Sequence, residues 1–153
     1  SSGEIKQIDE KFIKRFEMLD EPVTNRLVIE NDERQYCLAD CLKIHKQTAI
    51  PVLFDVYHHT ILNKDEPLKT AVEQAASTWR ESDGIPMLDY SSQAPGKRTG
   101  SHTDSIDPEA FQTFLRESRP FDFDIMLEIK DKQKSAAKAV KIAKKDKRFI
   151  TSD

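Results

Sequence analysis

Four short apolar runs along the chain each end in an acidic residue. The runs read LVIE, VLFD, PMLD and IMLE, and their acids are Glu30, Asp55, Asp89 and Glu128. Continuous apolar runs of this length are typical of strands that are buried on both faces, as in a parallel sheet. They lie roughly 25 to 40 residues apart, which leaves room for the helix that joins each pair of parallel strands. We therefore predict four parallel strands.

Helical periodicity fills most of the remaining chain. Apolar residues recur at helical spacing in residues 4–19, 36–47 and 67–84, and a strong helix start lies at Asp107 and Pro108. In the last segment, 131–148, lysines surround a narrow apolar stripe. A helix followed by four strand–helix units predicts an α/β fold. We expect one domain over residues 1–153, with a basic helix at its C-terminal end.

The composition indicates a cellular setting without identifying a partner. The formal net charge is −3, so no overall field indicates a polyanionic partner. Cys37 and Cys41 lie four residues apart in a predicted helix, a geometry that disfavours a disulfide and indicates a reducing, cytoplasmic setting. No apolar run approaches the length of a membrane span, and the first residues, SSGEIKQIDE, do not resemble a secretion signal. We expect an intracellular protein without a membrane partner.

The four acids all fall at the carboxyl ends of the predicted strands. In α/β folds this is the end at which ligands bind. For any single acid, capping of the following helix is an equally good explanation. Four carboxylates that converge on one site repel each other, however, unless a cation holds them together. The pattern therefore favours a cluster of divalent metal ions.

Two of the four histidines support the same prediction. His58 follows Asp55 by three residues, in the turn that we expect after the second strand, and the pair offers one oxygen and one nitrogen ligand. His102 lies in the polar stretch SSQAPGKRTGSHTD, which is too hydrophilic to belong to the core. His59 is left open as a ligand, a substrate contact or a support for a ligand. We interpret His45 as a packing or surface residue.

The motifs RLVIEND, IPVLFDVYHH, GIPMLDYSSQAPGKRTGSHTDSID and FDIMLEIKDK, in this order, resemble the C-terminal half of the UV damage endonuclease family, UvdE. The resemblance covers nearly the entire chain. It implies a metal-dependent DNA repair endonuclease that nicks double-stranded DNA on the 5′ side of ultraviolet photoproducts and other lesions. It also implies a TIM (β/α)8 barrel, of which the four parallel strands and their flanking helices form the C-terminal half.

The resemblance implies a set of metal ligands and a metal. The implied ligands are Glu30, Asp55, His58, Asp89, His102 and Glu128. Glu30, Asp55 and Glu128 would be the catalytic carboxylates, with Glu30 as a bridge between two ions, and the metal would be manganese or else magnesium. Some family members carry a histidine in place of Asp89 and a lysine in place of Met87. An aspartate still binds these hard cations well, whereas the contribution of the lysine is absent from this chain.

Contacts with DNA are predicted from local positive charge. Lys97 and Arg98 lie in a glycine-flanked loop at the predicted active face, and Lys130 follows the fourth strand closely. Each is equally well explained as a solvated side chain. The lysines of the last helix are better explained as its solvent-facing surface. Tyr57 and Tyr90 flank predicted ligands and either stack on a base or pack within the protein.

Length separates this chain from a complete barrel. A (β/α)8 barrel takes about 250 residues, whereas this sequence predicts four strands. A half barrel exposes two strand edges and an apolar concave face. We therefore expect self-association, a need for the N-terminal half of the barrel, weak metal binding and little nuclease activity in isolation. The alternatives are a metal-dependent sugar isomerase, a glycoside hydrolase with paired carboxylates, and a half barrel that binds a partner without catalysis.

Overall fold

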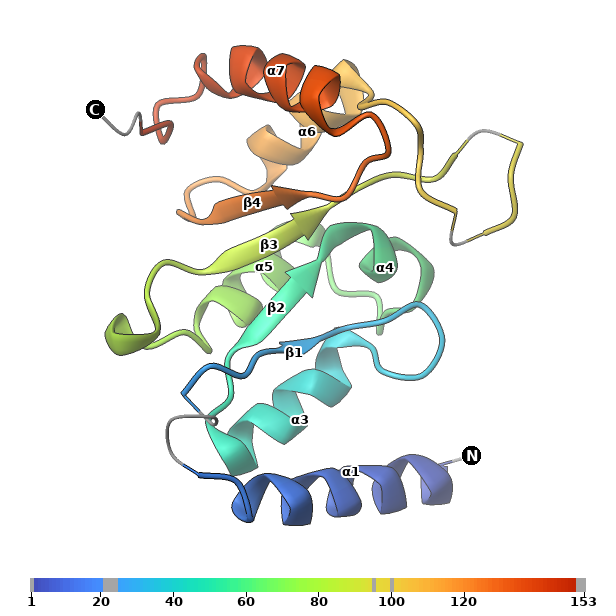
Figure 1. The fold of residues 1–153 in the computed structure, drawn as a ribbon, viewed down its shortest axis with the longest axis vertical. Coiled ribbons are helices and arrows are strands. Elements are labelled where there is room, and N and C mark those ends of the chain that lie inside the picture. Colours follow the sequence, from blue (N-terminus) through green and yellow to red (C-terminus); the bar gives the residue numbers. More distant parts are fainter. Residues whose placement is uncertain (1, 21–24, 95, 100, 151–153) are drawn as a thin grey trace.

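Four parallel strands form one sheet in the computed structural model, which describes residues 2–20, 25–94, 96–99 and 101–150. The strands are β1 (Ile29–Glu30), β2 (Val52–Asp55), β3 (Met87–Tyr90) and β4 (Asp124–Leu127). They lie side by side in sequence order (Figure 1). Sequential parallel strands form the wall of a (β/α)8 barrel, whereas a doubly wound sheet reverses its order at a switch point. The predicted α/β half-barrel fold is confirmed.

The helices occupy the predicted intervals with different ends. They are α1 (Ser2–Glu17), α3 (Leu38–Thr48), α4 (Val56–Ile61), α5 (Leu68–Ala76), the 3-10 helix η1 (Glu81–Asp83), α6 (Pro108–Glu117) and α7 (Lys132–Ala143). The start of α6 is as predicted, because the Asp107 carboxylate accepts hydrogen bonds from the N–H groups of Glu109 and Ala110. The prediction missed α4, and α5 ends well before residue 84.

The last helix is shorter than the predicted segment 131–148. It ends at Ala143, and the chain beyond it is fixed by Arg148. The Arg148 guanidinium forms an ion pair with Asp146 and donates hydrogen bonds to the carbonyl oxygens of Leu115 and Phe121. This ion pair holds the pKa of Asp146 well below its usual range. The periodicity of the lysines predicts that the helix continues to residue 148. Contacts of Arg148 with α6 and with the segment that follows α6 fix the chain in another conformation instead.

The hydrophobic core lies between the sheet and its helices. Val52 and Phe54 of β2, and Leu88 and Tyr90 of β3, are all buried and belong to one apolar cluster. The helices contribute Leu38, Cys41, Ala71, Val72, Ala75, Phe111, Phe114, Leu115 and Ala139 to it. Since side chains alternate along a strand, the residues between these four face the other side of the sheet, which we call the inner face.

The strand register places acids next to each other on the inner face. Asp55 lies opposite Asp89, and Asp89 lies opposite Met126. Glu30 lies opposite Leu53 on the neighbouring pair of strands. In Figure 1 the four arrows point to one side of the molecule, where α4 and the loop before α6 also lie. The register therefore gathers the strand-end acids along one edge of the sheet.

Several predictions away from this edge can be checked directly. Cys37 and Cys41 are not joined by a disulfide, as expected from their spacing. His45 packs at the end of α3, where its Nδ1 lies 2.8 Å from the carbonyl oxygen of Ile50, so the packing interpretation is confirmed. Among the residues that the structure describes, none of the helices combines the length and the apolar composition that crossing a bilayer requires.

Candidate metal centre

Asp55 ends β2 and begins α4. Its Oδ1 accepts a hydrogen bond from the His58 N–H at 2.8 Å, which caps the helix. Its Oδ2 is buried and accepts no hydrogen bond. A buried carboxylate oxygen that accepts no hydrogen bond is costly, and a nearby positive charge offsets this cost. The His58 ring, 3.3 Å away, supplies such a charge only when protonated, whereas a bound cation would supply it at any pH. Helix capping and cation binding, which the sequence left as alternatives, are therefore compatible in this one side chain.

Asn31 fixes the backbone of Asp55 from the neighbouring strand. Its side-chain Oδ1 accepts a hydrogen bond from the Asp55 N–H at 2.8 Å, and its Nδ2 donates to the Asp55 carbonyl oxygen at 3.0 Å. The side chain is fully buried. The Asn31 side chain thus takes the place of a backbone hydrogen-bonding partner between β1 and β2. It also sets the spacing between the ends of the two strands. Sequence reasoning missed Asn31, because an asparagine directly after a predicted strand carries no distinctive signal.

His58 lies within the first turn of α4, not in the loop that the sequence predicted. Its Nδ1 is 2.8 Å from the carbonyl oxygen of Asn31. A carbonyl oxygen only accepts hydrogen bonds, so Nδ1 carries the proton and Nε2 presents its lone pair in the neutral ring. The Nδ1 also lies 3.3 Å from Asp55 Oδ2 and 3.7 Å from Glu30 Oε1. The imidazole is therefore held among carboxylates in one tautomer.

Glu33 is a further carboxylate beside this histidine. Its Oε2 lies 3.4 Å from Nε2 of His58, on the opposite side of the ring from Asn31. Glu33 is half-buried and follows β1 closely in the chain. Sequence reasoning missed it because it lies past the strand end, outside the apolar-run pattern.

Two overlapping groups of side chains could each hold a cation. The first consists of Glu30, Asp55 and His58, and the second of Asp55, Asp89 and Glu128. In each group the ligand atoms all lie within 4.8 Å of one another. Asp55 belongs to both groups, and Oδ1 of Asp89 is a second buried carboxylate oxygen without a hydrogen-bond partner. Five of the six predicted ligands are thus brought together.

His102 lies beside the two groups and belongs to neither. Its ring centroid is 6.4 Å from that of His58 and 5.9 Å from that of Tyr57. A backbone bridge between Gln93 and His102 holds it in this position. The structure therefore brings the sixth predicted ligand to the edge of the cluster without placing it among the other five.

Burial and mutual repulsion raise the pKa values of the carboxyl groups in the cluster. Burial, followed by the charge of Asp55, raises the pKa of Glu30 to about 7. Burial, followed by the charges of Glu30 and Glu128, raises the pKa of Asp89 to about 7. Burial also raises the pKa of Asp55. Carboxyl groups with such pKa values are only partly ionised at neutral pH. A divalent cation would favour their ionised forms, so the cluster fits one electrostatically.

His58 responds to the same charges in the opposite direction. Burial alone would lower its pKa, but the Asn31 carbonyl and the carboxylates of Asp55, Glu33 and Glu30 outweigh burial and raise it. Oxygen donors with one or two imidazole nitrogens suit hard and borderline divalent cations, such as manganese, magnesium or zinc. The donor set and the two buried carboxylate oxygens without hydrogen bonds therefore both favour a divalent cation of this kind.

His59 and Tyr90 turn away from the cluster. The His59 ring is buried edge-on against Phe54, with centroids 5.2 Å apart, and its Nε2 lies 2.9 Å from the Glu66 carbonyl oxygen. Of the roles left open for it, those of ligand and substrate contact do not match this position. Tyr90 packs against Phe111 in the helix-facing core. Burial accordingly raises its pKa to about 12, and packing, not base stacking, explains it.

The loop with Lys97 and Arg98 is organised around Gln93. The Nε2 of Gln93 lies within 3.1 Å of the carbonyl oxygens of Ala94, Lys97 and Arg98. Its Oε1 accepts a hydrogen bond from the buried Tyr57 hydroxyl. Both cationic side chains are exposed. Gln93 thus connects this loop to α4, a role that sequence reasoning missed because a glutamine in a polar stretch carries no distinctive signal.

Lys130 follows the predicted ligand Glu128 by two residues. It is exposed, and its Nζ forms an ion pair with Oδ1 of Asp104 at 3.2 Å. The structure therefore places the three predicted DNA contacts, Lys97, Arg98 and Lys130, in loops that leave the carboxyl ends of β3 and β4.

Comparison with known proteins gives one consistent result. The family model for UV-endonuclease UvdE matches residues 2–149. The chain is 38% identical over 152 residues to the UV DNA damage endonuclease of Clostridium perfringens, an alignment that covers 98% of this chain and 37% of the relative. It is 31% identical over 125 residues to the UV DNA damage endonuclease of Bacillus cereus strain Q1, covering 80% of this chain and 39% of the relative.

A solved structure gives the same result in three dimensions. The crystal structure of SacUVDE matches with a TM-score of 0.88 and 42% sequence identity, over 95% of this chain and 48% of that chain. The chain therefore spans less than half the length of each of these relatives.

Proposed function

The chain belongs to the UV-endonuclease UvdE family, and on this premise we propose that it forms one half of a metal-dependent endonuclease that nicks damaged double-stranded DNA on the 5′ side of lesions. The observation that carries the proposal is the pair of overlapping ligand groups, with unpartnered buried oxygens on Asp55 and Asp89. A divalent cation would favour the ionised forms of these carboxyl groups, which burial and mutual repulsion otherwise disfavour.

We propose manganese, or else magnesium, as the cation. The ligands would be Glu30, Asp55, His58, Asp89 and Glu128, with His102 completing the set when a cation is bound. The family resemblance implies a bridging role for Glu30. In this structure Asp55 is the residue that would contribute to both groups, because it alone is common to them. Glu30, Asp55 and Glu128 would be the catalytic carboxylates.

A bound divalent cation would supply Lewis-acid activation of the phosphodiester and of the attacking water. The chain's own residues supply position. Asp55 is held through its side chain by the α4 cap and through its backbone by Asn31. The Asn31 carbonyl also orients the His58 ring. Donors fixed before the substrate arrives do not have to reorganise during the reaction.

Contact with DNA would come from the cations beside the cluster. Lys97 and Arg98 are exposed in a loop that Gln93 holds against Tyr57, and Lys130 is exposed beyond β4. Cationic side chains at these positions neutralise backbone phosphates and so align the duplex without reading its sequence.

Activity would also require the other half of the barrel. Met87 is half-buried and Met126 is 48% exposed on the inner face, where a closed barrel packs its interior. The described sheet ends in β1 on one side and β4 on the other, so both could pair with further strands. We propose that the chain alone binds metal weakly, cuts little or no DNA and associates with itself through this face.

Nicking of irradiated plasmid tests the function. The chain is mixed with, or fused to, the complementary portion of the Clostridium perfringens relative in the presence of manganese. We expect nicks in irradiated supercoiled plasmid with the completed barrel, few with the chain alone, and a loss of at least about a hundredfold on Asp55→Asn, since Asp55 belongs to both groups. Asp124→Asn is the matched control, because Asp124 lies at the opposite end of β4 and is exposed.

Three results would overturn the proposal. One is a correctly folded completed barrel that cuts irradiated and intact plasmid equally poorly. Another is unchanged nicking by the Asp55→Asn variant. The third is interconversion of an aldose and a ketose by the same preparation, which would assign the site to a sugar isomerase.

A further inference from the structure

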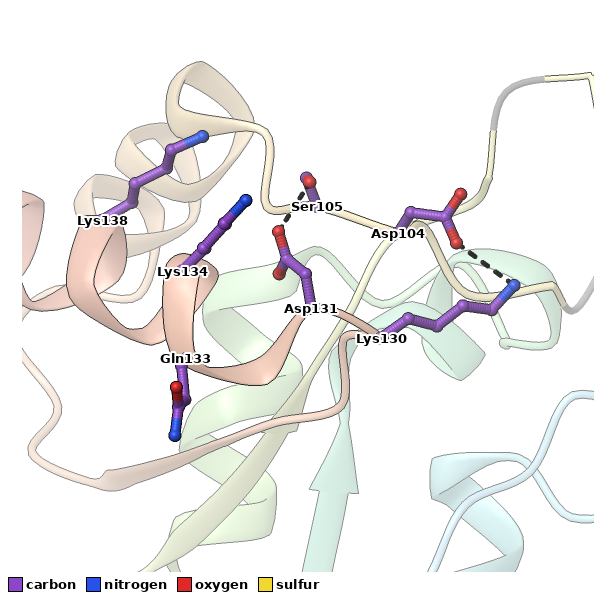
Figure 2. A pocket seen from close by; sticks show the side chains of 7 residues that line it. All are labelled: Asp104, Ser105, Lys130, Asp131, Gln133, Lys134 and Lys138. Carbon is purple, nitrogen blue, oxygen red and sulfur yellow. Dashed lines mark hydrogen bonds and ion pairs between the residues drawn. The ribbon is translucent and has the colours of Figure 1, made fainter.

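A cavity separate from the ligand groups lies at the start of α7. It is a shallow hollow, widely open to solvent, between the turn from β4 into α7 and the segment that follows His102. Its lining residues are Asp104, Ser105, Lys130, Asp131, Gln133, Lys134 and Lys138, which Figure 2 shows together. None of these residues belongs to either ligand group.

The acids of this cavity are already engaged within the protein. The Asp131 carboxylate accepts hydrogen bonds from the hydroxyl groups of Ser105, at 2.7 Å, and Ser135. These two hydrogen bonds lower the pKa of Asp131. Asp104 forms its ion pair with Lys130. The two carboxylates thus tie the loop after His102 to α7 and form the wall of the cavity.

Lys134 and Lys138 form no ion pair of this kind, although the charge of Lys138 does act on Asp131 and helps to lower its pKa. No carboxylate in the described part of the chain lies within ion-pair distance of either ammonium group. Figure 2 shows both side chains extending on the same side of α7, whereas Gln133 extends on the other. Residues four apart on a helix have Cβ atoms about 5–6 Å apart. The cavity therefore presents two adjacent positive charges, near a helix start that also favours anions.

The cavity is close to the ligand groups along both of its chain segments. Lys130 follows Glu128 by two residues, and Asp104 follows His102 by two residues. Two extended residues span at most about 7 Å. Phosphates follow one another along a strand of B-DNA at roughly 3.4 Å of helix axis. A phosphate a few nucleotides along the same strand is therefore within reach of the cavity.

We infer that Lys134 and Lys138 form a binding site for backbone phosphate of nucleic acid, a few nucleotides from the phosphate at the ligand groups. The inference rests on the proposed function for the path of the strand and extends it with residues that the family resemblance does not supply. The site would hold the strand in register through charge, without base recognition.

Binding of a fluorescently labelled DNA duplex in EDTA tests this site. Anisotropy is measured with the 153-residue chain at salt concentrations from roughly 50 to 200 mM. We compare wild type with the double variant Lys134→Gln/Lys138→Gln. Its matched control, Lys141→Gln/Lys145→Gln, removes the same charge at the same spacing from exposed positions outside the cavity. Circular dichroism confirms that both variants are folded.

The site predicts a difference between the two variants. Lys134→Gln/Lys138→Gln should weaken binding several-fold and reduce the slope of log K against log salt by about 0.9 for each phosphate that the protein no longer neutralises, whereas the control should match wild type. Equal weakening in both variants would overturn the inference, because it would indicate general charge attraction by the lysines of the C-terminal segment. No weakening in either variant would also overturn it.

A competition with inorganic phosphate distinguishes a site for DNA from a site for free phosphate, and the use of EDTA distinguishes this inference from the proposed nuclease activity. Replacing chloride with inorganic phosphate at constant ionic strength should displace DNA from wild type and not from Lys134→Gln/Lys138→Gln. If phosphate binds while DNA affinity stays the same in all variants, the site takes free phosphate and the inference fails. Because EDTA removes divalent cations, failure of the proposed nuclease would leave this binding readout unchanged.

Discussion

The two faces of the sheet differ sharply although they alternate residue by residue. On the helix-facing side, Phe54 and Leu88 are 0% and 1% exposed and pack against apolar helix residues. Their immediate neighbours Asp55 and Asp89 are equally buried on the inner face but have carboxylate oxygens without hydrogen-bond partners. The helix-facing side chains are packed by the chain's own helices, whereas the carboxylates of the inner face would be stabilised by a bound cation.

The inner face itself has two parts. Toward the carboxyl ends of the strands it carries the acids, and toward the amino ends it carries half-exposed apolar residues such as Met87. A bound cation would stabilise the acidic part, and further apolar residues packed against it would bury the apolar part. Stability is thus concentrated on the helix-facing side, and binding on the inner face.

The largest contrast should come from truncating one residue on each face. Phe54→Ala removes a fully buried ring from the core and should lower the free energy of unfolding by about 3–5 kcal/mol. Leu53→Ala, one residue earlier on the half-buried inner face, should cost well under half as much. Urea unfolding of the two variants measures both values. Equal losses would mean that the inner face is packed as well as the core.

A change of pH should affect the inner face selectively. Glu30 and Asp89 have pKa values of about 7 in the folded chain, above their ordinary values near 4. The folded chain then binds more protons than the unfolded chain between about pH 4 and pH 7. These two groups therefore contribute stability that is lost as the pH rises through about 7.

The Asp89→Asn variant isolates this effect. It removes the buried charge, so at pH 8 the metal-free variant should be more stable than wild type by on the order of 1 kcal/mol, with the difference vanishing near pH 4. Thermal unfolding in EDTA at several pH values measures the difference. A variant less stable than wild type at pH 8 would show that the Asp89 carboxylate is stabilised by contacts that do not require a cation.

The fold and the five gathered ligands could be predicted because they follow from short-range rules. An apolar run that ends in an acid specifies both a buried strand and the residue at its carboxyl end. Parallel pairing then brings Asp55 and Asp89 together whatever the connecting helices do. The six-residue helix α4, by contrast, is too short to give a periodic signal.

Residues that act across long sequence separations were not predictable. Asn31 bonds the backbone of Asp55, and Gln93 bonds Tyr57, through ordinary side-chain amides that leave no pattern in the sequence. The adjacent pair His58 and His59 was ambiguous for another reason. Neighbouring helical residues point about 100° apart, so only one of them could face the cluster, and the undetected helix decided which.

The smallest expected effect concerns the apolar part of the inner face. Met126→Lys places a charge on the exposed side chain of β4, where self-association would bury it. We expect dimers of the chain to weaken by about tenfold, while the free energy of unfolding of the monomer changes little. Sedimentation equilibrium measures the association constant. Unchanged association would place the contact elsewhere. Met18→Lys, at a more exposed methionine just beyond α1 and away from the sheet, is the control.

Manganese titration of three forms of the chain tests the shared cation site most directly. Asparagine still caps a helix, so Asp55→Asn keeps α4 while it removes the charge common to both ligand groups. In calorimetry, wild type and Asp124→Asn should bind manganese alike, with an affinity in the micromolar range or weaker, and Asp55→Asn should bind at least about tenfold more weakly. Submicromolar binding by wild type would contradict the need for the other half of the barrel. Equal binding by all three forms would contradict the site itself.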